Sequence, residues 1–243
     1  MLLKTKISKI KVLSEEWHKS RLGKFTSSEI YLLMNDKFWS QGCQTYIYRK
    51  VGELLAGKAV INDVETESTR WGSYYEAEAI RKYGIQKGLE YIICQQLITE
   101  KGSHFGCTPD GLVLKGESAD KLSYNVKTLE VKCPPTYSNF VGLALCETPQ
   151  HLKEESKQYY WQVLDQMDNC DTLEGDFIVY HPDFSYGNQR IIEFRKMQKI
   201  GVVNGKEIQY PLVADLKFLK ERKIMAVEKL KELHGKLVGL GKV

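Results

Sequence analysis

The fold is decided by FGCTPDGLVL, residues 105–114, and YNVKTLEVKCP, residues 124–134. Apolar residues alternate with other residues in both stretches, and Gly or Pro closes their ends, so each is predicted to form a β-strand. Asp110 lies between Pro109 and Gly111 and is therefore expected at the mouth of a strand rather than in its middle.

The second stretch carries an acidic and a basic residue two positions apart. Glu130 and Lys132 are expected on the same face of the strand, because strand side chains alternate between the two faces. Leu129, Val131 and Cys133 point the other way, into a predicted core. Two carboxylates and one lysine then converge at the edge of a sheet.

This combination has a chemical use. Carboxylate oxygens bind hard divalent cations, and a nearby lysine can orient or deprotonate a water molecule. Each motif alone also has a simpler interpretation, since an Asp-Gly pair often forms a turn and an exposed Glu-x-Lys is often a weak surface ion pair. Both motifs in this order favour metal-dependent phosphodiester hydrolysis, and an apolar-flanked charged pair is costly to bury without a metal.

The composition is that of a globular enzyme. The chain has 243 residues, of which 42% are hydrophobic and 27% charged, enough for one large domain over residues 1–243. Its formal charge of +4 permits an anionic partner without requiring one. The sequence shows neither a membrane-spanning apolar run nor a signal peptide, and we expect a cytoplasmic location.

Cysteine and histidine spacings do not indicate a metal cage. Six cysteines are scattered without a CxxC pair, and five histidines show no ligand spacing. These spacings argue against a zinc ribbon, an iron–sulfur cluster or a disulfide framework, and they favour a reducing compartment.

The remaining chain alternates helical and strand patterns. Ser14 begins a predicted helix, and a second one starts at Thr26-Ser27-Ser28-Glu29, with a glycine break between them, all within 14–34. Further helices are expected at 44–56, 70–84 (ending at Gly84), 152–169 and 213–237, strands at 91–99, 105–114, 124–133, 176–181 and 189–196, and a polar linker at 57–68. This order predicts an α/β (α+β) core with a central mixed β-sheet flanked by helices, and it lacks the regular alternation and glycine-rich loop of a nucleotide-binding fold.

Four blocks carry a specific resemblance, and they follow one another in the family order. They are WHKSRLGKFTSSE at 17–29, RWGSYYEAEA at 70–79, CTPDGL with LEVKCP at 107–134, and QYYWQVLDQM at 158–167. In these blocks the chain resembles the phage lambda exonuclease, or YqaJ-type viral recombinase, family of the PD-(D/E)XK nuclease superfamily. The resemblance implies a restriction-endonuclease-like core, with an N-terminal helical segment that binds a 5′-phosphate and an added C-terminal helix.

The resemblance also assigns roles at the expected metal site. Asp110 and Glu130 match the metal ligands, with the Val131 carbonyl between them as a backbone ligand. The family frame WGxxYE selects Glu76 rather than Glu78 as a further ligand. The implied cofactor is Mg²⁺, with two ions in each active site, Mn²⁺ as a competent substitute and Ca²⁺ as an inert one.

Two further residues complete the catalytic set. Lys132 is expected to position and activate the attacking water, and neighbouring cations are expected to shift its pKa towards useful values. Gln162 is expected to hydrogen-bond that water or the scissile phosphate. Tyr159 lies one helical turn earlier on the same face and is expected among the DNA-binding residues.

The N-terminal block implies recognition of a DNA end. Arg21 offers a bidentate donor for phosphate, and Thr26 and Ser28 offer hydroxyls and amides at a helix start. By resemblance these three residues bind the 5′-phosphate of the strand being degraded, and Thr108 stands where the family has a serine. A simple N-cap by Thr26 or Ser27 is the alternative. Trp17 is expected to pack rather than to stack on a base.

The implied activity is 5′→3′ digestion of linear double-stranded DNA, which releases 5′-mononucleotides and leaves 3′ overhangs. The resemblance further implies a ring-shaped homotrimer and a single-strand annealing protein as partner in phage recombination. The alternatives are a structure- or sequence-specific endonuclease, a single-strand nuclease, or a DNA-end binding module without cleavage. The complete set of Glu76, Asp110, Glu130 and Lys132 speaks against the last alternative.

Overall fold

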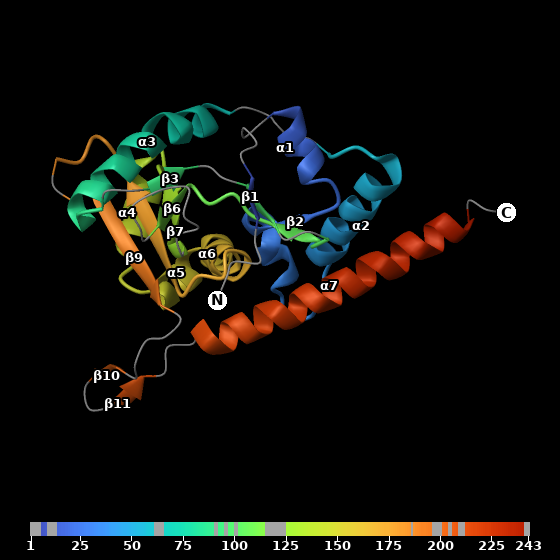
Figure 1. Ribbon diagram of the computed structural model, residues 1–243. Helices are drawn as coiled ribbons and strands as arrows, with labels where there is room; N and C mark the ends of the chain where they lie inside the picture. The colour runs from blue at the N-terminus through green and yellow to red at the C-terminus, as the bar shows by residue number, and fades with distance from the viewer. Residues whose placement is uncertain are drawn as a thin grey trace.

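The centre of the molecule is a mixed sheet in the strand order β3-β6-β7-β8-β9 (Figure 1). In this computed structural model the described residues are 6–8, 14–60, 66–89, 92–94, 97–99, 102–114, 125–185, 187–195, 201–203, 206–208 and 212–240. The sheet strands are β3 (Ile92–Cys94), β6 (Gly111–Leu114), β7 (Asn125–Lys132), β8 (Glu174–Tyr180) and β9 (Gln189–Arg195). This architecture confirms the expected mixed sheet with flanking helices.

The pair β7–β8 is parallel, whereas the other neighbours in the sheet are antiparallel. A parallel pair requires a crossover connection. The chain supplies one with α4 (Tyr137–Ala144), α5 (Pro149–Glu155) and α6 (Lys157–Asn169). This crossover brings the face of α6 against the two central strands.

The two faces of the sheet are covered by different helices. Phe177 and Val179 of β8 pack in a core with α6, whereas Ile178 and Tyr180 pack in a core with α3 (Glu67–Lys87). Glu130 pairs in register with Phe177 and therefore points towards α6. The strand alternation predicted around Glu130 is confirmed, because Leu129, Val131 and Cys133 lie in the core on the α3 side.

The N-terminal segment forms a separate wall beside the sheet. It contains α1 (Glu15–Ser20), β2 (Phe25–Thr26), the 3₁₀ helix η1 (Ser27–Leu33) and α2 (Gln41–Ala56). Strand β2 pairs in parallel with β5 (Phe105–Gly106), and the remaining short strands are β1 (Lys6–Ser8), β4 (Leu97–Thr99), β10 (Gly201–Val203) and β11 (Lys206–Ile208). The β2–β5 pair brings the chain near Thr26 next to the chain near Thr108.

Several predicted boundaries were wrong. Helix α3 does not end at Gly84, which is buried within it; the helix continues to Lys87 and stops at Gly88, whose φ of 62° favours glycine. The second N-terminal helix is a 3₁₀ helix. Each of the elements expected at 91–99, 105–114 and 152–169 is divided into two elements in the structure. Helix α4 and the β10–β11 hairpin were not predicted. Parts of the linker expected at 57–68 and of the expected strand ends lie outside the described residues.

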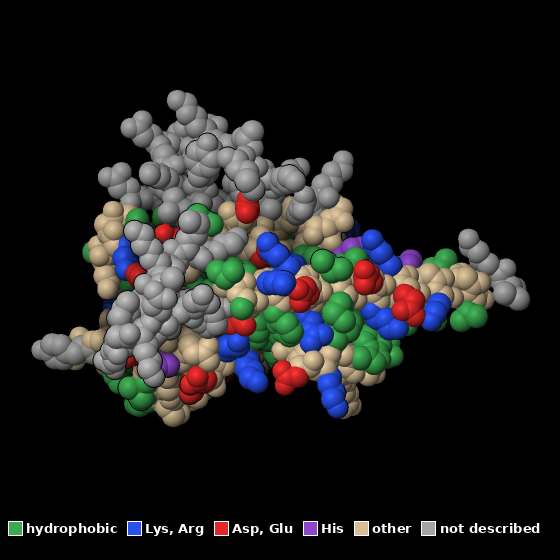
Figure 2. Space-filling view, turned by 90° about the horizontal axis from the view of Figure 1, so that it is seen from below, with side chains coloured by type: hydrophobic (Ala, Val, Ile, Leu, Met, Phe, Trp, Pro, Cys, Tyr) green, Lys and Arg blue, Asp and Glu red, His purple; other side chains and the backbone are tan. Residues whose placement is uncertain are grey.

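Helix α7 (Leu212–Leu240) runs along the outside of α2 and η1 and extends past them at its C-terminal end (Figure 1). Its outer surface carries lysines interspersed with acidic residues (Figure 2), and Leu216, Leu219 and Leu230 are buried against the body. None of the helices in the described part of the chain has the length and apolar character needed to cross a membrane.

A buried charge network attaches α7 to α6. Lys223 Nζ donates to Asp165 Oδ1 at 2.9 Å, to Asp168 Oδ2 at 2.8 Å and to Asn169 Oδ1 at 2.9 Å. Burial lowers the pKa of Lys223, but the Asp165 and Asp168 carboxylates outweigh burial and raise that pKa above its ordinary value. Asp165 itself is fully buried, so its charge depends on this partner.

We expect Lys223→Met to lower the free energy of unfolding by about 3–5 kcal/mol, because it leaves the buried Asp165 carboxylate without its cation. Lys220→Met is the matched control on the same helix, since Lys220 is 55% exposed and contacts Asp168 at 3.4 Å. An exposed pair of this kind contributes about 0–1 kcal/mol. Urea unfolding of the two variants measures the difference, and equal losses would contradict the assignment.

Candidate active site

A continuous cleft crosses the molecule above the ends of β6 and β7. One hollow of about 430 Å³ is lined by residues that include Lys132 and Tyr159, and a second of about 480 Å³ by residues that include Arg21 and Gln162. The two hollows share the wall residues Thr69, Ser73, Glu76 and Asp110. A third hollow of about 300 Å³ continues the second beyond Trp17, Arg21 and Ser28.

The cleft brings together the residues expected from separate parts of the sequence. Ten of the eleven site residues line its walls: Arg21, Thr26, Ser28, Glu76, Thr108, Asp110, Val131, Lys132, Tyr159 and Gln162. Glu130 differs from these, because it is only 1% exposed and lies beneath the wall.

Glu130 is held by donors on both of its carboxylate oxygens. Gln162 Nε2 donates to Oε1 and Gln166 Nε2 donates to Oε2, each at 2.6 Å, and Lys132 Nζ also donates to Oε1. The two glutamines are one turn apart on α6, so both reach the same strand residue. Gln162 was expected to hydrogen-bond the attacking water or the scissile phosphate. In the structure its side-chain amide donates to the Glu130 carboxylate.

Asp110 precedes β6 and accepts a hydrogen bond from the Val131 N–H at 2.7 Å. Burial and the nearby Glu130 and Glu76 carboxylates raise the pKa of Asp110 well above its usual range, although Lys132 and the Val131 N–H oppose this shift. Three acidic side chains are thus close enough for their charges to interact.

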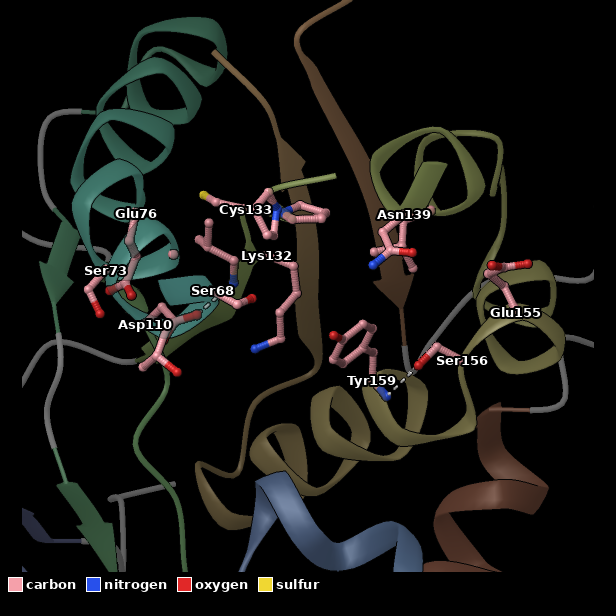
Figure 3. A pocket seen from close by; sticks show the side chains of 16 residues that line it. Ser68, Ser73, Glu76, Asp110, Lys132, Cys133, Asn139, Glu155, Ser156 and Tyr159 are labelled. Atoms are coloured by element: carbon pink, nitrogen blue, oxygen red, sulfur yellow. Dashed lines mark hydrogen bonds between the residues drawn. The ribbon is translucent and has the colours of Figure 1, made fainter. Parts of the chain in front are cut away.

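Lys132 projects between Asp110 and Tyr159 in the cleft (Figure 3). Its ammonium lies 5.3 Å from the centre of the Tyr159 ring. Burial lowers the pKa of Lys132, but the Glu130 and Asp110 carboxylates outweigh that effect and raise the pKa above its ordinary value. The lysine is therefore a cation here, and the expectation that neighbouring metal ions lower its pKa stays a prediction.

Helix α3 separates its two candidate glutamates. Glu76 lines the cleft beside Asp110 (Figure 3), whereas Glu78 accepts from the Tyr180 hydroxyl at 2.8 Å and lies 3.1 Å from Lys82 Nζ. This placement agrees with the preference for Glu76 over Glu78.

The donor chemistry of the cleft fits a hard divalent cation. Glu76, Asp110 and Glu130 offer carboxylate oxygens, and Val131 lies next to them in the wall. Mutual repulsion of these carboxylates raises the pKa of Asp110, and a bound cation would relieve that repulsion. Within the described residues, no group of three His, Cys, Asp or Glu side chains is arranged to hold a metal ion. The Glu130 carboxylate accepts hydrogen bonds from its two glutamine donors instead.

The proposed phosphate-binding residues lie at the other end of the cleft. The Arg21 guanidinium stacks on the Trp17 ring at 3.9 Å, and Trp17 is buried, as expected for a packing residue. Thr26 occupies the N-cap of η1, but its side chain makes no capping hydrogen bond; its hydroxyl lies 3.4 Å from that of Ser28. The simple capping role is therefore not observed for Thr26, and Ser27 instead donates to Asp165 at 2.6 Å.

A buried ion pair fixes the turn that follows Arg21. Lys50 Nζ lies 3.0 and 3.1 Å from the two Glu53 oxygens, and Glu53 also accepts from the Gly23 N–H at 2.9 Å. Gly23 has a φ of 64°, and a Cβ there would lie 2.4 Å from Leu54 Cδ2. Only glycine suits this position, and the turn holds Arg21 at the cleft.

Two parts of the site were not predicted from sequence. Gln166 was missed because a glutamine on a helix has a surface position as its default; its spacing of four from Gln162 was the available signal. Thr69 and Ser73 were also not predicted. Ser73 follows Thr69 by four residues and precedes Glu76 by three, so all three side chains share one face of α3 and line the cleft.

The fold is that of solved exonucleases. An alkaline exonuclease from Laribacter hongkongensis (LHK-Exo) superposes with a TM-score of 0.63 and 22% identity, over 93% of this chain and 100% of that chain; a complex of that enzyme with dAMP gives the same values. A phage-related exonuclease from Haemophilus somnus 129PT gives a TM-score of 0.59 and 12% identity, over 88% and 96%. At these identities the likeness establishes the fold alone.

The family is established by sequence. The chain belongs to the family of the YqaJ-like viral recombinase domain, whose profile matches residues 16–171, more than half of the chain. All four blocks that carried the resemblance fall within this range, so the family expectation is confirmed. A search of curated protein sequences finds no match.

We expect Asp110→Asn to raise the melting temperature of the protein in EDTA. Because the pKa of Asp110 is raised on folding, its ionisation destabilises the fold at neutral pH, and this cost is absent below the ordinary pKa near 4. Each kcal/mol regained should add about 2–4 °C at neutral pH, and the gain should vanish at acidic pH.

Asp176→Asn serves as the contrast for this measurement. Asp176 is also buried, but it is paired with Arg195 Nη1 at 2.7 Å and accepts from the Tyr83 hydroxyl at 2.7 Å. Its neutralisation should lower the melting temperature, because Arg195 loses its anion. A fall for Asp110→Asn as well would show that the cleft carboxylates do not repel one another.

Proposed function

We propose that the chain is a metal-dependent 5′→3′ exonuclease on linear double-stranded DNA, which releases 5′-mononucleotides and leaves 3′ single strands for phage-type recombination. One observation supports this activity above the others. A single cleft runs from Arg21, Thr26 and Ser28 to Glu76 and Asp110, so a terminal phosphate and a scissile phosphate would lie along one groove.

Glu76, Asp110 and Glu130 would hold Mg²⁺ ions, together with the Val131 carbonyl. Two such ions supply a Lewis acid for the phosphate and charge neutralisation for the attacking and leaving oxygens. Hard oxygen ligands suit Mg²⁺ and Mn²⁺ alike, and the paired site is proposed from the family resemblance.

The chain's own residues orient the reactants. Lys132 projects into the cleft beside Asp110 and is placed to hold a water molecule near the phosphate, or to take its proton once the amine is neutral. Gln162 and Gln166 fix the Glu130 carboxylate by one hydrogen bond to each oxygen. The Tyr159 ring restricts the position of the Lys132 side chain.

Recognition of the 5′ end would give the reaction its direction. Arg21, Thr26, Ser28 and Thr108 line one hollow and offer a guanidinium and three hydroxyls to a terminal phosphate. With the 5′-phosphate held there, the first phosphodiester of the strand would lie near the carboxylates at Glu76 and Asp110. The dAMP complex of LHK-Exo is consistent with release of 5′-mononucleotides here.

The remaining features of the proposal follow from the family. The sheet and its helices form a restriction-endonuclease-like core, and residues 1–243 form one domain with a helical N-terminal phosphate-binding segment and a C-terminal helix. A homotrimer around the duplex and a single-strand annealing protein are the proposed partners, in the cytoplasm of a bacterial host.

One gel tests the activity. End-labelled linear duplex, closed circular duplex and single-stranded DNA are incubated with and without Mg²⁺. We expect digestion of the linear duplex only, from its 5′ ends and only with Mg²⁺. Cleavage of the circle would indicate an endonuclease, preference for the single strand a single-strand nuclease, and binding without cleavage an inactive end-binding module.

Lys132→Ala should reduce turnover by about 100-fold or more, because general-base and electrostatic contributions have this size. Metal binding should persist, since the lysine acts on water rather than on the cation. Calorimetric titration with Mn²⁺ checks binding, and single-turnover kinetics checks chemistry. Asp110→Ala, as the comparison variant, should lose both, and loss of Mn²⁺ binding in Lys132→Ala would contradict the proposed role.

Arg21→Ala should remove most of the preference for 5′-phosphorylated over 5′-hydroxyl ends, because a charge-assisted contact contributes about 1.5–3 kcal/mol. Initial rates on the two linear duplexes measure this preference. Arg81→Ala is the control, since Arg81 is an exposed arginine on α3 outside the cleft walls. Equal wild-type rates on both ends would leave Arg21 as an ordinary surface arginine.

A further inference from the structure

We propose that Arg49 is a second arginine of the terminal-phosphate pocket, and that Glu29 competes with the phosphate for it. This inference rests on the proposed function, because it deepens the 5′-end recognition described above. It makes the pocket selective for the end of a strand over an internal phosphodiester. The third hollow of the cleft carries the residues concerned, and Glu29 and Arg49 in its wall have no part in the catalytic proposal.

This hollow continues the cleft on the far side of Arg21. It shares Trp17, Arg21 and Ser28 with the neighbouring hollow, and its remaining walls include Glu29 and Arg49. A phosphate placed between Arg21 and Ser28 would therefore have Arg49 on its other side.

The Arg49 side chain is oriented by the same contacts that shape the phosphate segment. Its guanidinium carbon lies 4.9 Å from the centre of the Tyr46 ring. The Tyr46 hydroxyl in turn accepts from the Thr26 N–H at 2.8 Å. Helix α2 thus holds Arg49 and Thr26 in a fixed relation, as a preorganised anion site requires.

Two residues that line this hollow each carry a buried donor without an acceptor. Arg49 Nε and Trp17 Nε1 have no hydrogen-bond partner anywhere in the described structure, and Trp17 is 7% exposed. A buried donor is costly to leave unpaired, so an acceptor-rich ligand that reached these atoms would be favoured. A phosphate monoester presents three terminal oxygens and can satisfy donors from several directions.

Charge explains the role of Glu29. Arg49 Nη2 donates to Glu29 Oε1 at 2.5 Å, with side chains 24% and 34% exposed. The neighbouring Lys50 and Glu53 are buried and bind each other, so they neutralise one another in this wall. A terminal monoester carries about −1.5 to −2 at neutral pH, whereas an internal diester carries a single charge, so only the former competes well with Glu29 for the guanidinium.

Substitutions of Arg49 and Glu29 should therefore shift the preference for 5′-phosphorylated ends in opposite directions. Arg49→Gln should lower the rate ratio of 5′-phosphorylated to 5′-hydroxyl duplex by about 10-fold, and it should weaken inhibition by inorganic phosphate, because 1.4 kcal/mol corresponds to one decade. Glu29→Gln frees the guanidinium and should raise the ratio and strengthen that inhibition. Arg49→Lys should restore little, because a lysine cannot make a bidentate contact.

Lys87→Gln and Glu193→Gln are the matched controls. They break an ion pair of 2.7 Å that is also partly exposed but lies between α3 and β9, and neither should change the ratio. Melting temperatures of all variants show whether the fold is kept. If Arg49→Gln and Glu29→Gln shift the ratio in the same direction, or leave it unchanged, the pair is structural and the inference is overturned. A wild type indifferent to the 5′-phosphate would instead refute the terminal pocket itself.

Discussion

One buried carboxylate, Asp165, connects the three segments on which the cleft depends. It receives Lys223 from α7 on one oxygen and the Ser27 hydroxyl from η1 on the other, and it is fully inaccessible to solvent. A desolvated charge is tolerated only when it is well paired, so these three segments must assemble together. Gln162 and Gln166 flank Asp165 on α6 and hold Glu130. The same helix therefore fixes both the phosphate segment and the central carboxylate.

The charge distribution gives the cleft a direction. Acidic side chains gather where β6 begins and β7 ends, at Glu76 and Asp110, and arginines gather where α1 and α2 meet, at Arg21 and Arg49. The charge along a DNA backbone is uniform, and a terminal phosphate monoester adds further charge at an end. The basic end of the groove can therefore attract a terminal phosphate, whereas the acidic end repels the backbone until cations occupy it.

Short-range chemistry in the sequence predicted much of the cleft. The two-residue alternation around Glu130 and the position of Asp110 at the mouth of a strand depend on local geometry alone, and both predictions are confirmed. The spacing of four residues places Gln166 on the same helical face as Gln162, but the contact of that face with Glu130 depends on how α6 crosses the sheet, which is a long-range feature. The continuation of α3 through Gly84 had the same origin, because that glycine packs in the core beside Ile92 and tertiary contact outweighs helix propensity.

Helix α3 is attached unequally along its length. The hydrogen bonds of its later turns to the sheet are directional, as for Tyr83 with Asp176, whereas Trp71 in its first half touches His181 through ring faces and edges. Aromatic contacts tolerate sliding better than hydrogen bonds do. Glu76 lies about 10 Å along the helix from Tyr83 at 1.5 Å per residue, so a tilt of about 5° about that anchor displaces Glu76 by roughly 1 Å. A tilt of α3 about its Tyr83 contact would therefore change the width of the groove at Glu76.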